Sequence, residues 1–159
     1  MGMQGNEENI IDLSLKKAKK QRFRINGESD NILELNTSDI GILSRLKYIY
    51  PKLQKLAEEA LTFTDEEKND NSVEGLFKFA DKLDTIDDNM GKLLDELFDA
   101  NVSETCKDGG KFYDLFDGMF RFEHIIETLS ELYTTGFDKE FSKVKQRIDK
   151  HTGKYIKNV

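Results

Sequence analysis

The sequence "NILELNTSDIGILSRLKYIY", residues 31–50, contains the change of pattern that decides the fold. Leu33 and Leu35 alternate with polar residues, which is the period-two pattern of a half-buried strand. Ile42, Leu46 and Ile49 then follow at spacings of four and three, which places them on one face of a helix. The intervening NTSD offers side chains that favour a helix N-terminus. We therefore predict an α+β fold that is mainly α-helical, with a small sheet at its N-terminal end.

The period-two pattern also covers the residues before this stretch. Apolar residues alternate with polar ones in the runs 11–15, 23–25 and 33–35. Between the first two runs lies the charged KKAKK, and between the second and third lies NGESDN, whose Asn-Gly pair suits positive φ. These features predict a small antiparallel β-meander over about residues 9–36. We expect the polar and acidic residues 1–8 to form a disordered tail.

Three long apolar stripes with helical spacing follow the meander. They predict helices over about residues 38–62, 73–100 and 120–152, joined by a polar linker at 64–72 and a connector before the last helix. Pro51 predicts a kink or break near Tyr50, Gly136 a bend, and Gly153 the end of the last helix. We therefore expect one domain over residues 9–152, followed by a basic C-terminal tail at 153–159.

Composition narrows the class of protein. A length of 159 residues suits a single domain, and the lone cysteine fits a reducing compartment. No apolar run approaches the roughly 20 residues that a membrane span requires. The net charge of −7 is uneven, with +3 in residues 1–24, −14 in 25–137 and +4 in 138–159. An acidic middle makes nucleic acid an unlikely partner, although the basic ends leave a local contact open.

The connector "ETCKDGGKFYDLFDGMFRFEH", residues 104–124, combines the cysteine, a histidine and several aspartates. Cys106 and His124 have no orienting motif, so structural roles are favoured over a nucleophile and base. Zinc would need carboxylates to complete its shell. The aspartates lack calcium-loop spacing, and the Gly-Gly pair lacks the phosphate-loop pattern. We predict no catalytic, cofactor or metal site, and no enzyme activity.

Aromatic density is the more informative feature of this connector. Such density predicts packing on the core or on a partner protein. The candidate partner-binding residues are Phe112, Tyr113, Leu115, Phe116, Met119 and Phe120. By contrast, we expect the carboxylates of Asp84, Asp87 and Asp88 to form a solvated helix face.

Three stretches carry a resemblance to a known family: "INGESDNILELNTSDIGILSRLKYIYPKL", "LLDELFDANVSETC" and "FRFEHIIETLSELY". They resemble tail assembly chaperones encoded by siphophages and prophages of Gram-positive bacteria, and the resemblance covers most of residues 20–152. It implies a non-catalytic protein of the host cytoplasm that binds the long helical tape-measure protein during tail morphogenesis. It also implies recruitment of the tail-tube protein. It transfers no residue-level binding site.

Two alternatives stay open. The apolar stripes exceed what a small core needs, which allows self-association as well as client binding. A phage or mobile-element regulator would instead bind a host protein or nucleic acid through its basic ends. Salt-dependent binding to DNA or RNA separates that hypothesis from the chaperone hypothesis.

Overall fold

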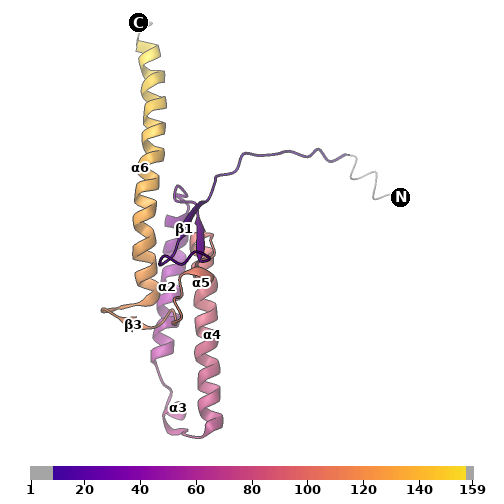
Figure 1. Ribbon diagram of the computed structural model, residues 1–159, viewed down its shortest axis with the longest axis vertical. Coiled ribbons are helices and arrows are strands. Elements are labelled where there is room, and N and C mark those ends of the chain that lie inside the picture. The colour runs from indigo at the N-terminus through magenta and orange to yellow at the C-terminus, as the bar shows by residue number, and fades with distance from the viewer. Residues whose placement is uncertain (1–8, 157–159) are drawn as a thin grey trace.

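The computed structural model describes residues 9–156, and it confirms the predicted fold class: a mainly helical α+β protein with a small N-terminal antiparallel sheet (Figure 1). The elements are β1 (Gln21–Arg24), β2 (Ile32–Leu35), α2 (Ile42–Leu61), α3 (Asp65–Asn69), α4 (Val73–Phe98), α5 (Val102–Thr105), β3 (Leu115–Phe116), β4 (Met119–Phe120) and α6 (Arg121–Ile156). The disordered tail predicted for residues 1–8, and the end of the predicted basic tail at 157–159, lie outside the described residues.

The N-terminal sheet is a two-stranded hairpin. Phe23 pairs with Leu33, and the turn uses positive φ at Asn26 and Gly27, two residue types that tolerate this conformation. Leu33 and Leu35 are completely buried, so this hairpin covers one end of the helical core. The second and third predicted strands are thereby confirmed.

The first predicted strand, over residues 11–15, is wrong. Residues 10–20 are an exposed, extended arm that leaves the body of the molecule (Figure 1). Ile11 and Leu13 keep more than four fifths of their surface exposed. Period-two patterning makes a strand only where a neighbouring strand supplies hydrogen bonds, and KKAKK is not a tight turn that would bring one alongside.

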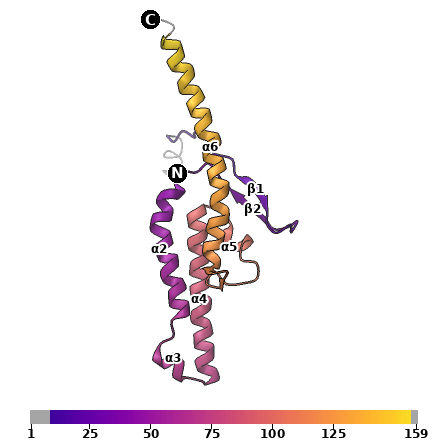
Figure 2. The ribbon, with the colours of Figure 1, turned by 90° about the vertical axis from the view of Figure 1, so that its left-hand side faces the viewer.

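The core lies where α2, α4 and the first half of α6 run side by side (Figure 2). Completely buried members include Leu53 of α2, Leu94 of α4 and Phe122 of α6. Helix α2 continues through Pro51, so a break at Tyr50 is wrong. Pro51 is exposed, while Leu53 and its neighbours on the buried face hold the helix against α4 despite the missing backbone donor.

The segment predicted as a polar linker contains the short helix α3. Thr64 caps it by accepting a hydrogen bond from the Glu67 N–H at 3.1 Å. Ser72 caps α4 in the same way, by accepting from the Gly75 N–H at 3.0 Å. The start of α4 at Val73 agrees with the sequence prediction, since Ser72 is a preferred capping residue.

Helix α6 is longer than predicted and is unbroken at both glycines. It passes Gly153 and ends at Ile156, because one glycine weakens a helix by only about 1 kcal/mol and does not by itself end it. Gly136 has a different role from the predicted bend. A Cβ there would collide with the Thr37 carbonyl oxygen and lie 2.7 Å from the Thr37 carbonyl carbon. Gly136 therefore allows α6 to approach the backbone that precedes α2.

Gly136→Ala should destabilise the protein, although alanine is the better helix former by about 1 kcal/mol. The added methyl group forces α6 away from Thr37, and we expect the free energy of unfolding to fall by about 1–3 kcal/mol. Urea unfolding monitored by circular dichroism measures it. Thr135→Ala, at the exposed neighbouring position, is the matched control and should change stability little. A Gly136→Ala protein more stable than the parent would show that this close approach does not exist.

Candidate interaction surface

The six candidate residues of the connector occupy three different environments. Phe112 is buried in the core with 1% of its surface exposed, so it is not a contact residue. Tyr113, Met119 and Phe120 are half-buried. Leu115 and Phe116 are exposed by 55% and 40%, and together they form what we call the hairpin tip. Of the six candidate residues, only the two of the hairpin tip are exposed enough for a partner to cover.

The hairpin tip lies on β3, which forms a β-hairpin with β4 around a two-residue turn. Leu115 pairs with Phe120 and Phe116 with Met119 across a turn at Asp117 and Gly118, which have φ values of 51° and 76°. Two successive residues with positive φ, of the type Asp-Gly, are typical of a type I′ hairpin. The prediction of a connector between helices did not include this hairpin, which "LFDGMF" could have indicated.

Asp87 attaches the connector to α4. Its side chain is 1% exposed, so the predicted solvated face is wrong for this residue. Asp87 Oδ1 accepts a hydrogen bond from the Phe112 N–H at 2.8 Å, and Oδ2 forms an ion pair with Lys107 Nζ. Lys111 Nζ lies 3.9 Å from the same Oδ2. A buried carboxylate is tolerated only with such partners, so these contacts fix the place where the connector crosses α4.

Asp114 and Arg121 close the base of the hairpin. Asp114 Oδ2 accepts from the Lys111 N–H at 2.8 Å, and the Asp114 carbonyl accepts from the Arg121 N–H at 2.7 Å. The Arg121 side chain donates through Nε to the Lys111 carbonyl at 3.2 Å. Burial, and next the charge of Asp87, raise the pKa of Tyr113 beside this network. These contacts hold both strands of the hairpin to the first turn of α6.

The Phe116 ring makes two side-chain contacts although it is exposed. Arg121 places its guanidinium carbon 4.9 Å from the ring centroid, in a cation–π contact. His124 stacks on the ring at 4.3 Å with an interplanar angle of 18°, and its Nε2 donates to the Phe116 carbonyl at 2.8 Å. The side chain is thereby ordered in an exposed position, which suits a surface that binds a partner without reorganising.

A cavity of about 370 Å³ opens beside the hairpin tip. Ile125 and Leu129 of α6 contribute apolar walls, and Arg24, Arg121 and His124 contribute cationic and polar ones. Phe116 forms part of the same lining. The hairpin tip and this cavity together, which we call the tip surface, can receive apolar side chains of a protein partner.

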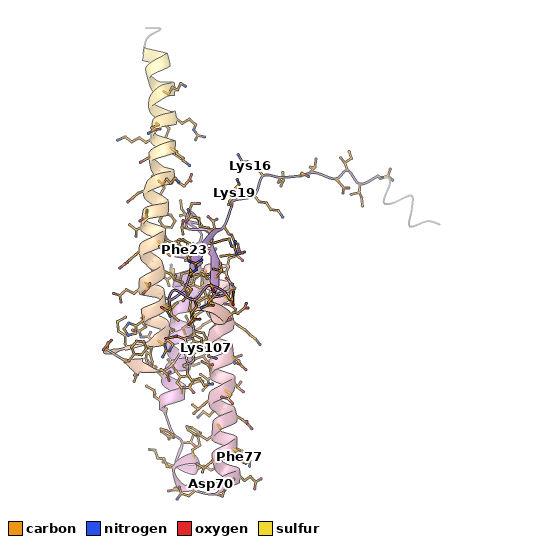
Figure 3. All side chains as sticks on the ribbon, in the orientation of Figure 1. Lys16, Lys19, Phe23, Asp70, Phe77 and Lys107 are labelled. Carbon is orange, nitrogen blue, oxygen red and sulfur yellow. The ribbon has the colours of Figure 1, made fainter. Side chains whose placement is uncertain are left out.

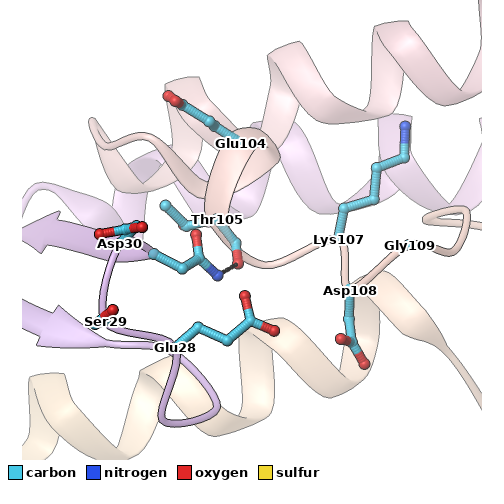
Figure 4. Close-up of a pocket in the computed structure, with 9 residues that line it drawn as sticks. Glu28, Ser29, Asp30, Glu104, Thr105, Lys107, Asp108 and Gly109 are labelled. Carbon is cyan, nitrogen blue, oxygen red and sulfur yellow. Dashed lines mark hydrogen bonds between the residues drawn. The ribbon is translucent and has the colours of Figure 1, made fainter.

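A second hollow, of about 740 Å³, lies between the β1–β2 turn and the segment that follows α5 (Figure 4). Its lining carboxylates are Glu28, Asp30, Glu104 and Asp108, with Lys107 beside them. Asn31 Nδ2 donates to the Thr105 carbonyl at 2.7 Å and holds the turn in place. Among the described residues, no group of three or more His, Cys, Asp or Glu side chains is arranged to hold a metal ion.

Cys106 lines the tip surface, as does His124, but its environment disfavours a thiolate. Burial raises the pKa of the Cys106 thiol; the Thr105 hydroxyl 3.4 Å away lowers this pKa by a smaller amount, and the charge of Asp95 raises it by less still. His124 is occupied by the Phe116 ring and carbonyl. The pair is therefore arranged for packing and orientation, as the absence of a motif indicates.

Exposed apolar residues also gather elsewhere. At the end of the molecule that carries α3, Leu76 and Phe77 are exposed by 56% and 66% (Figure 3). On α6, Phe141 and Ile148 are exposed by 54% and 53%. Within residues 9–156, no helix is long and apolar enough to cross a membrane. Among these exposed residues, Phe116 of the hairpin tip combines exposure with a cavity and with contacts that order its aromatic ring.

Comparison of this chain with protein-family models, with curated proteins and with solved structures finds no match. The tail-chaperone resemblance therefore stays a prediction.

Asp87→Ala should lower the free energy of unfolding by about 2–4 kcal/mol, because it leaves the buried Phe112 N–H without an acceptor and removes the partner of Lys107. Asp84→Ala is the matched control on the same helix. The Asp84 side chain is 64% exposed, and its Oδ1 lies 3.5 Å from Lys111 Nζ. Removing this carboxylate should therefore lower the free energy of unfolding by less than about 1 kcal/mol. Chemical denaturation measures both values. Equal effects of the two substitutions would contradict the proposed attachment.

Cys106 should react slowly with a thiol reagent. A raised pKa leaves less thiolate at a given pH, so at pH 8 the folded protein should react at least about tenfold more slowly than the same thiol in denaturant. The rate should begin to rise at a higher pH than for the unfolded chain. Absorbance of the released chromophore gives both rates. A folded protein that reacts faster than the unfolded chain would indicate an activated cysteine instead.

Proposed function

We propose that this protein is a non-catalytic binding protein that receives an apolar helical client on the tip surface. The observation that supports it is an exposed aromatic side chain, Phe116, that contacts both Arg121 and His124 and lines an open cavity. Exposed apolar groups of a monomer are seldom ordered in this way without a partner. Aromatic anchors next to a pocket are the arrangement that dominates binding energy at protein interfaces.

An amphipathic helix is the client that suits this surface. Leu115 and Phe116 project from the hairpin, while Ile125 and Leu129 lie one turn apart on α6 at the floor of the cavity. A client helix with apolar residues at spacings of three and four can place one residue against the tip and the next in the cavity. Arg24 and Arg121 at the rim would favour a client with acidic flanks.

The most specific form of the proposal is a phage tail assembly chaperone whose client is the tape-measure protein. The resemblance noted in the sequence supports it, and the acidic middle of the chain, with a charge of −14, would keep a complex with an apolar client soluble. In this role the protein acts in the host cytoplasm and helps to recruit tail-tube subunits.

The rival function is a regulator that binds nucleic acid. The observation in its favour is the arm, where Lys16 and Lys19 project into solvent away from the body (Figure 3). Four lysines in five residues give this arm the capacity for phosphate contacts. The acidic body opposes such binding, which is why the helix-binding function is favoured.

Leu115→Ser/Phe116→Ser should abolish solubilisation of the tape-measure protein from the same genome when the two are expressed together. The substitutions remove the apolar anchors without touching the core. The matched control is Leu76→Ser/Phe77→Ser, two adjacent residues that are more exposed and lie near the start of α4. The control should retain the activity of the parent. The fraction of client in the soluble extract is the measurement.

Two outcomes would contradict the proposal. If only the control variant loses the client, the tip surface is not the binding site. If the client stays equally insoluble with and without this protein, while the protein alone binds DNA at about 0.15 M salt, the regulator function replaces the chaperone function.

A further inference from the structure

From Phe141 onward, the second half of α6 presents an apolar stripe that no other described element covers, whereas Phe137 at the start of the stripe is half-buried against the core. Phe122, Ile125, Leu129 and Tyr133 of the first half are buried in the core. Every residue from 138 to 148 is exposed, and Figures 1 and 2 show this half of the helix extending beyond the body. Even so, Phe137, Phe141, Val144 and Ile148 keep spacings of four, three and four. This spacing is that of the apolar positions of a coiled coil, with Phe141 and Ile148 at a and Phe137 and Val144 at d.

The charges along α6 divide into two halves of opposite sign. Residues 121–140 contain five acidic and two basic residues, a charge of −3, whereas residues 141–156 contain one acidic and five basic residues, a charge of +4. A second α6 in parallel orientation would place the basic halves together. A second α6 in antiparallel orientation places each basic half towards the acidic half of its partner, and it also aligns the two helix dipoles favourably.

We infer that the stripe Phe137–Ile148 is the interface of a two-fold symmetric dimer, in which α6 of a second copy of this chain lies antiparallel to the first. The surface of each copy is complementary to itself, as a closed two-fold interface requires. Phe141 then faces the partner's Val144, and Phe137 faces the partner's Ile148. The two-fold axis passes between Ser142 and Lys143.

The flanking charges agree with this register. Positions e and g flank the apolar seam, and an antiparallel pair brings e beside e and g beside g. Asp138 at e then meets the partner's Lys145, and Glu140 at g meets the partner's Arg147. Both pairs have opposite charges, and symmetry repeats each of them. Glu140 has only a local partner within its own chain, Lys143 at 3.5 Å, with both side chains about half exposed.

The body of each copy also leaves space for the C-terminal end of the partner's α6. Beyond Phe137, the line of the stripe continues through Thr134 and Ser130, which border an apolar cavity of about 140 Å³. Ile42 and Leu43 of α2 line the same cavity, and Leu43 is 58% exposed. The last turns of the partner's α6 therefore run towards an apolar groove between α2 and α6.

The stripe spans twelve residues, which is about 18 Å of helix. An interface of this length is smaller than that of most stable complexes, so the dimer should form on the order of micromolar concentration. Sedimentation equilibrium of the full chain, across about 1–200 μM, covers this range. We expect a mass that rises from monomer to dimer. A monomer over the whole range would overturn the inference.

Two single variants test the interface itself. Phe141→Asp should raise the dimer dissociation constant at least about a hundredfold, because it places a charge in the apolar seam. Since Phe141 lies outside the core, circular dichroism should be unchanged. Glu140→Lys should raise the dissociation constant about tenfold, because it sets two like-charged pairs across the interface.

The orientation is tested by rescue. In the antiparallel dimer, Glu140→Lys/Arg147→Glu restores both opposite-charge pairs and should recover the affinity of the parent. In a parallel dimer, Glu140 would instead meet the partner's Lys145, so Glu140→Lys/Lys145→Glu would be the rescuing pair. Rescue by the second pair alone would overturn the antiparallel assignment.

Experiments can contradict the dimer without contradicting the proposed function, and the reverse. Leu115→Ser/Phe116→Ser lies outside the stripe, so this variant should dimerise like the parent even though client binding is lost. If the parent chain is monomeric and Phe141→Asp abolishes client solubilisation, the stripe is occupied by the client and not by a second copy.

Discussion

The buried carboxylate of Asp87 is the interaction on which the arrangement of the second half of the chain depends. It accepts the Phe112 N–H and pairs with Lys107, so the connector must cross α4 at this one place. The Phe112 carbonyl in turn accepts from the Phe122 N–H at 3.1 Å, which sets the start of α6. Because a buried charge is costly without partners, Asp87 strongly favours the position of the connector in which the Phe112 N–H and Lys107 reach it. The hairpin tip and the direction of α6 follow from them.

Much of the fold could be predicted because the apolar spacing of three and four residues reflects helix geometry directly. The failures have tertiary causes. The alternation of Ile11, Leu13 and Leu15 matches a strand, but a strand needs a neighbour that the pattern cannot show. Gly136 resembles a helix breaker in sequence, whereas in the fold it allows α6 to contact the backbone at Thr37.

The candidate site could be predicted only in part. Aromatic density in the connector predicted packing on the core or on a partner; Phe112 lies in the core, while Leu115 and Phe116 are exposed. Composition could not assign each residue to one of these environments, because exposure depends on where the hairpin is attached. Asp84 and Asp87 look alike in the sequence of α4, yet Asp87 is buried and accepts from the Phe112 N–H, 25 residues away, whereas Asp84 is 64% exposed. The spacing of apolar and charged residues along α4 does not reveal such a long-range contact.

Two surfaces then have separate uses in this account: the tip surface for a helical client and the α6 stripe for a second copy. Hydrogen exchange of the full chain, alone and in complex with the tape-measure protein, tests the first use most directly. The account predicts slower exchange of backbone amides from Tyr113 to Phe120 in the complex, with little change in α3 and the first turns of α4. Slower exchange confined to α3 and the start of α4, with the hairpin unchanged, would contradict it.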